Sequence, residues 1–263
     1  MIPYRDDNPT ATTPVVTHAL IAINVVVFLL CWANQQQAIW EYGFIPWELI
    51  RGRLHPDSTA LPGFAELFTS MFMHGSFMHL AGNMLFLWVF GDNVEDAMGH
   101  RRFLVFYLAT GLLAQAAQLA ALCLEAGAPP VYPISAEVVM SGVVTSPVVG
   151  WFIPVVGASG AISGVLAAYY LLYPSARVRM LVPIFIIITT MSVPAAFVIG
   201  YWFLLQLLSG VMGSSAGGGV AWWAHVGGFV GGLLLTNLFL TPAIRQRLKV
   251  RRNWRRVQRH TGR

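Results

Sequence analysis

The chain has 263 residues, of which 56% are apolar and only 10% are charged, whereas soluble globular domains average about 25% charged residues. This composition excludes a soluble globular protein. It also excludes a disordered chain, which needs low hydrophobicity and high charge. A mean hydropathy of +0.64 indicates a polytopic membrane protein. Nucleic-acid binding is not indicated by the net charge of +5, because nine of the 16 Lys and Arg residues lie in the last 19 positions.

A membrane-spanning helix needs about 20 mostly apolar residues. The first candidate segment is read as a signal anchor rather than a cleaved signal peptide, because it is long and no basic segment precedes it. We predict an all-α fold, a polytopic bundle of six transmembrane helices. The predicted spans are residues 16–33, 68–90, 103–123, 157–173, 195–212 and 220–240.

The stretch from Leu181 to Met212 contains no charge. As one straight helix its 32 residues would extend about 48 Å, well beyond the hydrocarbon core of roughly 30 Å. Pro183 and Pro194 divide it. We therefore expect residues 181–192 to form an interfacial or partly inserted lead-in, followed by a single span at 195–212.

Basic residues decide between six and seven spans, because cytoplasmic loops are enriched in Lys and Arg. With six spans and the N-terminus inside, 14 of the 16 basic residues lie inside and only Arg51 and Arg53 lie outside. This predicts a cytoplasmic segment at 1–15, a membrane domain at 16–240 and a basic cytoplasmic tail at 241–263. The tail is expected to lie near anionic lipid; RNA binding is the weaker interpretation.

Strongly polar groups inside spans are costly and indicate functional sites. No Asp or Glu lies in any predicted span. This absence excludes an intramembrane aspartyl protease and disfavours a proton-coupled carrier. A His-Glu-x-x-His metalloprotease is also excluded, because His74 and His79 are five residues apart with no Glu between them. A serine–histidine pair remains.

The predicted topology brings one serine and one histidine to the same depth. Ser159 and His225 both lie within about 10 Å of the outer ends of the fourth and sixth spans. Small residues recur every fourth position beside each of them, which allows two membrane helices to approach closely. The hydroxyl could then reach the imidazole, the contact that activates a weak nucleophile. The small residues are Gly160, Gly164 and Ala168 on one helix, and Ala224, Gly228 and Gly232 on the other.

A tetrahedral oxyanion needs hydrogen-bond donors. His79 and Asn83 share one face of the second span because they are four residues apart. The amides at the start of the fourth span also favour negative charge, and Gly157 suits a sharp turn into that span. Each group alone has an ordinary interpretation as a packing or interfacial residue. His74 either supports the site or is merely interfacial.

These residues resemble the rhomboid family of intramembrane serine proteases. Four motifs carry the resemblance, in order along the chain and on the expected spans. They are His74-x4-His79-x3-Asn83, the inner-loop pattern Gly91-x3-Glu95-x3-Gly99, Gly157-Ala158-Ser159-Gly160, and Ala224-His225-Val226-Gly227-Gly228.

The resemblance implies a serine endopeptidase with Ser159 as nucleophile and His225 as general base. His79, Asn83 and the Ser159 amide would line the oxyanion hole, with His74, Gly157, Gly160 and Gly228 in supporting roles. It further implies single-span membrane proteins as substrates, cut in or near their transmembrane segments, with no metal or cofactor required. The alternatives are a client-binding protein on the same scaffold that does not cut, and a transporter.

The sequence departs from the family pattern in two places. Some members carry a Tyr one turn after the serine, stacked against the histidine. That position is Ser163 here, so another group must orient His225. A Trp-Arg pair of the first outer loop is absent, although Trp47 and Arg51 are nearby.

Three expectations concern the loops and the location of the protein. Residues 124–156 form a long outer loop that partly inserts or covers the site. Residues 213–219 act as a cap or gate. A bacterial inner membrane is expected, since the sequence reads as a compact core with neither a soluble domain nor a targeting peptide.

Overall fold

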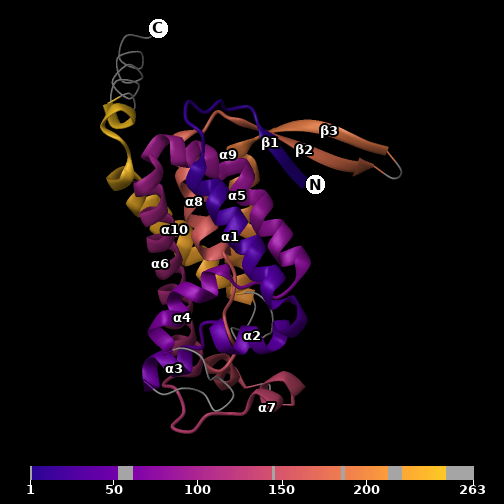
Figure 1. The fold of residues 1–263 in the computed structure, drawn as a ribbon, viewed down its shortest axis with the longest axis vertical. Coiled ribbons are helices and arrows are strands. Elements are labelled where there is room, and N and C mark those ends of the chain that lie inside the picture. Colours follow the sequence, from indigo (N-terminus) through magenta and orange to yellow (C-terminus); the bar gives the residue numbers. More distant parts are fainter. Residues whose placement is uncertain (1, 53–61, 144–145, 185–186, 213–220, 247–263) are drawn as a thin grey trace.

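A computed structural model describes residues 2–52, 62–143, 146–184, 187–212 and 221–246. Long helices run side by side, a small sheet lies at one end of the bundle, and short helices and loops lie at the other end (Figure 1). The helices are α1 (Val15–Cys31), η1 (Trp32–Asn34), α2 (Gln35–Tyr42), α3 (Pro46–Arg51), α4 (Gly63–Thr69), η2 (Ser70–Phe72), α5 (Phe77–Met98), α6 (His100–Ala126), α7 (Ala136–Ser141), η3 (Pro147–Trp151), α8 (Ser159–Leu172), α9 (Ala195–Met212) and α10 (Trp222–Phe239). The strands are β1 (Ile2–Asp6), β2 (Arg177–Ile184) and β3 (Ile187–Pro194).

The fold is mostly helical, as the composition predicts. Each predicted span overlaps one long helix: α1, α5, α6, α8, α9 and α10. By length and composition alone, three helical stretches in the described part can cross a membrane, and α8 is a shorter apolar helix. The three stretches are Val15–Tyr42, His100–Ala126 and Ala195–Met212.

The second predicted span is displaced along the sequence. Residues 68–90 were expected to be helical throughout, but α4 and η2 end at Phe72 and α5 begins only at Phe77. Ser76 caps α5, since its hydroxyl accepts a hydrogen bond from the His79 amide at 3.1 Å. The Gly91–Glu95–Gly99 pattern consequently lies in the last turns of α5 and at its end, rather than in a loop.

An antiparallel sheet of order β1-β2-β3 departs from the all-α expectation. Residues 181–192 were expected to form an interfacial or partly inserted lead-in, but residues 181–184 belong to β2 and residues 187–192 to β3. Sequence 184–190 (IFIIITT) is rich in β-branched residues, which favour strands. The hairpin projects sideways from the bundle (Figure 1). Strand β1 and the described C-terminal residues lie at this same end of the molecule.

Helix α8 runs through the centre of the bundle, and glycine contacts fix its position. A Cβ on Gly228 would lie 2.0 Å from the Gly160 carbonyl oxygen, and one on Gly232 would lie 2.5 Å from that of Gly164. The predicted close approach of the two small-residue ridges is thereby confirmed. Helix α6 also packs against α8, where a Cβ on Gly164 would meet Thr110 at 2.4 Å.

A buried carboxylate attaches α1 to α5. Glu95 is fully buried, and its oxygens accept hydrogen bonds from the Val16 amide at 2.9 Å and the Thr17 amide and hydroxyl at 2.7 Å. A negative charge at a helix N-terminus is favourable because unpaired amides and the helix dipole meet there. His100 contacts the same carboxylate at 2.5 Å. Glu95 thus contacts the N-termini of both α1 and α6, at the end of the bundle that carries the sheet.

Candidate active site

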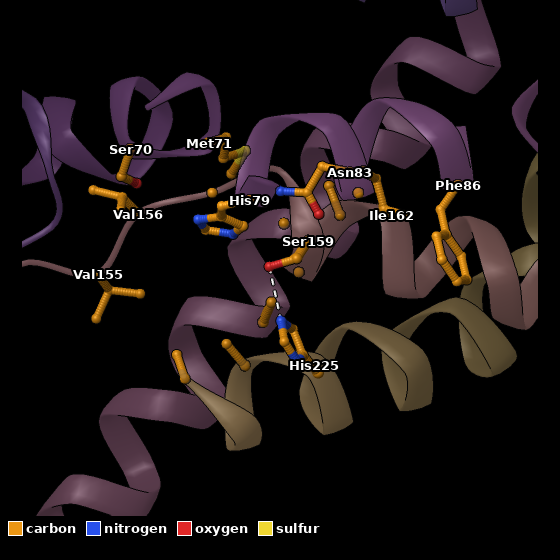
Figure 2. Close-up of a pocket in the computed structure, with 18 of the residues that line it drawn as sticks. Ser70, Met71, His79, Asn83, Phe86, Val155, Val156, Ser159, Ile162 and His225 are labelled. Atoms are coloured by element: carbon orange, nitrogen blue, oxygen red, sulfur yellow. Dashed lines mark hydrogen bonds between the residues drawn. The ribbon is translucent and has the colours of Figure 1, made fainter. Parts of the chain in front are cut away.

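The structure brings Ser159 and His225 together. Ser159 is the first residue of α8, and His225 lies in the first turn of α10. The Ser159 Oγ lies 2.7 Å from the His225 Nε2, shown as a dashed line in Figure 2. The backbones beneath them are held by the contact between Gly160 and Gly228. The spacing therefore depends on packed backbone and not on flexible side chains.

The second nitrogen of His225 has a partner that sequence reasoning missed. Gln206 of α9 brings its Oε1 to 2.7 Å from the His225 Nδ1. The rings of Trp202 and Trp222 flank the imidazole at centroid distances of 5.7 and 6.4 Å. Ser163 instead donates its hydroxyl to the Ser159 carbonyl oxygen at 2.6 Å. The signal available in the sequence was a single amide side chain in the otherwise apolar span 195–212.

His79 and Asn83 of α5 face the serine across the pocket (Figure 2). Asn83 is buried, and its Nδ2 has no hydrogen-bond partner among the described residues. Leaving a buried donor unpaired costs free energy, so this amide is available for a ligand. Gly157 has a φ of +124°, and a Cβ there would lie 2.8 Å from the His79 ring. Only glycine fits this close turn.

Backbone hydrogen bonds hold the segment that leads into Ser159. The Gly157 amide donates to the Ser70 carbonyl at 2.9 Å. Phe44 and Val155 exchange two backbone hydrogen bonds of 3.0 and 2.8 Å. No described side chain caps the N-terminus of α8. Its first amides therefore remain free to donate near the Ser159 hydroxyl.

His74 was predicted within the second span, and that placement is wrong. It lies in the connection between η2 and α5, because the helix starts only after the Ser76 cap. Its side chain is buried, and its ring meets the His79 ring edge-on at a centroid distance of 5.1 Å. His74 thus packs against His79 and is not among the residues that line the pocket.

Ser159, His225, His79 and Asn83 line a cavity of about 710 Å³. Its polar lining residues are Ser70, Ser76, His79, Asn83, Gln115, Ser159, Gln206 and His225. Apolar side chains make up much of its lining (Figure 2). They include Met78 and Phe86 of α5, Ile162 of α8 and Trp202 of α9. Across the described ranges, no three His, Cys, Asp or Glu side chains gather to hold a metal ion. The absence of a metal or cofactor requirement stays a prediction.

The short helices and loops at the end of the bundle opposite the sheet form a packed layer (Figure 1). Trp47 Nε1 and Arg51 Nε both donate to the Pro130 carbonyl, at 2.9 and 3.1 Å. Glu66 is fully buried and accepts from the Ile45 amide at 3.0 Å. Burial, together with a hydrogen bond to Glu48, raises the pKa of Glu66 well above its ordinary value of 4.5. Protonation of this buried carboxyl is therefore favoured well above its ordinary pKa.

Residues 124–156 contain two short helices, α7 and η3. The expected gate at 213–219 lies outside the described residues, as does most of the basic tail. Within the described part of that tail, Arg245 donates to the Asn237 carbonyl at 3.0 Å.

Comparison of the sequence with known proteins identifies the family of the chain. A family model described as a rhomboid domain matches residues 62–242. The chain is 27% identical over 224 residues to Rhomboid protein 1, mitochondrial, of Saccharomyces cerevisiae, covering 82% of this chain and 51% of that protein. It is 29% identical over 163 residues to Presenilin-associated rhomboid-like protein, mitochondrial, of Homo sapiens, covering 62% of this chain and 34% of that protein. The chain spans about half the length of the first relative and about a third of the second. Since the family model covers more than half of the chain, the chain belongs to the rhomboid family.

Proposed function

We propose that this chain is an intramembrane serine endopeptidase that cleaves single-span membrane proteins. The observation that carries the proposal is the 2.7 Å contact between the Ser159 Oγ and the His225 Nε2 inside a cavity of about 710 Å³. A serine hydroxyl is a weak nucleophile at its free pKa, and an adjacent imidazole activates it by taking its proton. Membership of the rhomboid family supports the same chemistry.

The proposal includes six membrane spans, formed by α1, α5, α6, α8, α9 and α10. An even number is supported by the location of β1 and the described C-terminal residues at one end of the bundle (Figure 1). That end also carries Arg101, Arg102, Arg177 and Arg179, so it is the cytoplasmic end by the positive-inside rule. The dyad then opens toward the outer face, and the basic tail lies near anionic lipid on the inner face.

In the proposed reaction, the Ser159 Oγ attacks the scissile carbonyl carbon while the His225 Nε2 accepts the hydroxyl proton. The developing oxyanion lies near Asn83 Nδ2, the His79 ring and the first amides of α8. Preorganised donors of this kind are each worth about 10²–10³ in rate. The imidazolium then gives its proton to the leaving amine, and a water repeats the sequence to release the acyl group.

The substrate class follows from the surroundings of the cavity. Apolar side chains of α5, α8 and α9 line one side of it, which suits an apolar transmembrane segment. A helical peptide bond is shielded and its carbonyl is already hydrogen-bonded. The substrate must therefore unwind locally, at residues that weaken a helix, before Ser159 can reach a carbonyl.

The compartment belongs to the proposal as well. The compartment predicted from the sequence is a bacterial inner membrane, whereas both named relatives carry the word mitochondrial in their names. Fractionation of native cells distinguishes the two.

Reconstitution tests the activity. The purified full chain is placed in liposomes with a single-span substrate, and cleavage is compared with that of Ser159→Ala and His225→Ala. We expect both variants to lose activity by about 10³-fold or more, and Ser141→Ala, an exposed serine on α7, to match the wild type. A fluorophosphonate should label the wild type and neither dyad variant. A wild type that binds the substrate without cutting or labelling would support the client-binding alternative instead.

A further inference from the structure

Gln206 is a buried amide on a helix that otherwise presents apolar side chains to its surroundings. It is 7% exposed, while Phe197, Leu204 and Leu208 of the same helix are 46% to 65% exposed. A polar side chain within an apolar span is costly unless a partner satisfies it. The partner of Gln206 is the His225 Nδ1 at 2.7 Å. This contact joins α9 to the proposed general base.

The chemistry of the two groups fixes the state of the imidazole. A neutral imidazole carries one N–H, on either nitrogen. The Gln206 Oε1 can only accept a hydrogen bond, so the Nδ1 must be the donor. The Nε2 is then left with its lone pair, which is the form that can accept the Ser159 proton. The opposite tautomer would direct an N–H at the serine and could not act as a base.

Among the described residues, Nδ1 makes no hydrogen bond besides the one to Gln206. Ser163, one turn after the nucleophile, is bonded to the Ser159 carbonyl. Trp202 and Trp222 contact the imidazole ring with their own rings, and an indole N–H is a donor only. Residues 138–263 contain no Asp or Glu. No carboxylate therefore follows the serine in the chain to complete a triad of the usual acidic kind.

We propose that Gln206 is the positioning residue of this site: an uncharged third member that holds His225 in the reactive tautomer and orientation. The proposal rests on the proposed function. It also makes α9 part of the catalytic assembly, because Gln206 and Trp202 both belong to that helix. When α9 is displaced from α10, the Oε1 separates from the Nδ1 and the imidazole is released.

Two substitutions at Gln206 separate positioning from packing. Gln206→Leu keeps a similar volume and removes the acceptor, whereas Gln206→Glu keeps an acceptor at the same reach. Leu208→Ala on the exposed side of α9 serves as the control. Each full-length variant is reconstituted with the single-span substrate. The readouts are kcat, KM, the rate of fluorophosphonate labelling and Tm.

We expect Gln206→Leu to lower kcat and the labelling rate together by about 10- to 100-fold, the usual effect of losing a group that orients a functional histidine. KM and Tm should stay close to the wild type. Gln206→Glu should recover most of the lost kcat, and Leu208→Ala should behave as the wild type.

Other outcomes overturn the inference in distinguishable ways. If Gln206→Leu keeps wild-type kcat and labelling while Ser159→Ala is inactive, the positioning role is wrong and the protease proposal stands. Equal losses in the Leu and Glu variants, or losses accompanied by a lower Tm, would assign Gln206 a structural role. If the wild type neither cleaves nor labels, the proposed function itself fails.

Discussion

Helices α8 and α9 both contact His225, but α8 is packed much more closely into the bundle than α9. Helices α8 and α10 touch backbone to backbone through glycines, and α8 is buried over nearly its whole length. Helix α9 has only four buried residues in 18, and its outward side chains are large and exposed. Ser159 and His225 stand on the closely packed pair, whereas Gln206 stands on the loosely packed helix.

This difference separates two tasks that an intramembrane enzyme must perform. Reacting groups must stay within a few tenths of an ångström of their positions, which close packing achieves because packed interiors deform little. A substrate must also enter between helices, and a loosely attached helix allows that at lower cost. The hydrogen bond from α9 to His225 connects the two tasks.

The largest expected effect breaks the packed side. Gly228→Ala introduces a Cβ that would lie 2.0 Å from the Gly160 carbonyl oxygen, and a backbone atom cannot move aside as a side-chain end can. Overpacking of this kind costs about 1–3 kcal/mol or more. We expect a lower Tm in detergent and loss of nearly all cleavage, because Ser159 and His225 are pushed apart.

Helix α9 provides the matched control for that substitution. A Cβ on Gly200 would meet nothing within 4 Å, so Gly200→Ala should leave cleavage unchanged. Its Tm should be unchanged or slightly raised, since alanine in a helix interior is up to about 1 kcal/mol more favourable than glycine. Equal damage from the two substitutions would show that the two helices are packed alike, contrary to the comparison.

The next prediction removes a hydrogen-bond donor from the pocket and leaves the contact between α8 and α10 intact. Asn83→Ala deletes an Nδ2 that has no partner among the described residues, so folding loses no hydrogen bond from that atom. We expect kcat to fall by about 10²–10³ with little change in KM or Tm. Steady-state kinetics and thermal unfolding of the same preparation measure both. A kcat near that of the wild type would remove Asn83 from the proposed oxyanion hole.

Much of the closely packed side could be predicted from the sequence. Hydropathy located all six long helices, and the four-residue spacing of small residues predicted the contact between α8 and α10. The start of α5 was missed because residues 68–76 carry no Asp, Glu, Lys or Arg and include four Phe and Met side chains. The Ser76 cap marks the start of α5, so His74 lies before the helix.

The hairpin and the loosely packed side were harder to predict for physical reasons. A continuous apolar run has no period that separates a buried strand from a helix, so residues 181–192 were not assigned to strands. Gln206 was visible as a lone amide, but its partner depends on how α9 is rotated about its own axis. Without a charge or motif, the sequence does not specify that rotation.

The smallest effect concerns Glu66, which accepts a hydrogen bond from the Ile45 amide. The neighbouring Phe44 pairs with Val155, in the segment that leads into Ser159. Because burial raises the folded-state pKa of Glu66, the folded chain binds this proton more tightly than the unfolded chain does. Stability from Glu66 is therefore full below its ordinary pKa of 4.5 and declines as the pH rises toward the raised value. Glu66→Gln mimics the protonated form at every pH and keeps an acceptor for the Ile45 amide. Between pH 5 and pH 8 we expect the Tm of the wild type to fall by about 2–4 °C more than that of the variant. Glu137→Gln on exposed α7 should follow the wild type, and parallel curves for the wild type and Glu66→Gln would contradict a protonated Glu66.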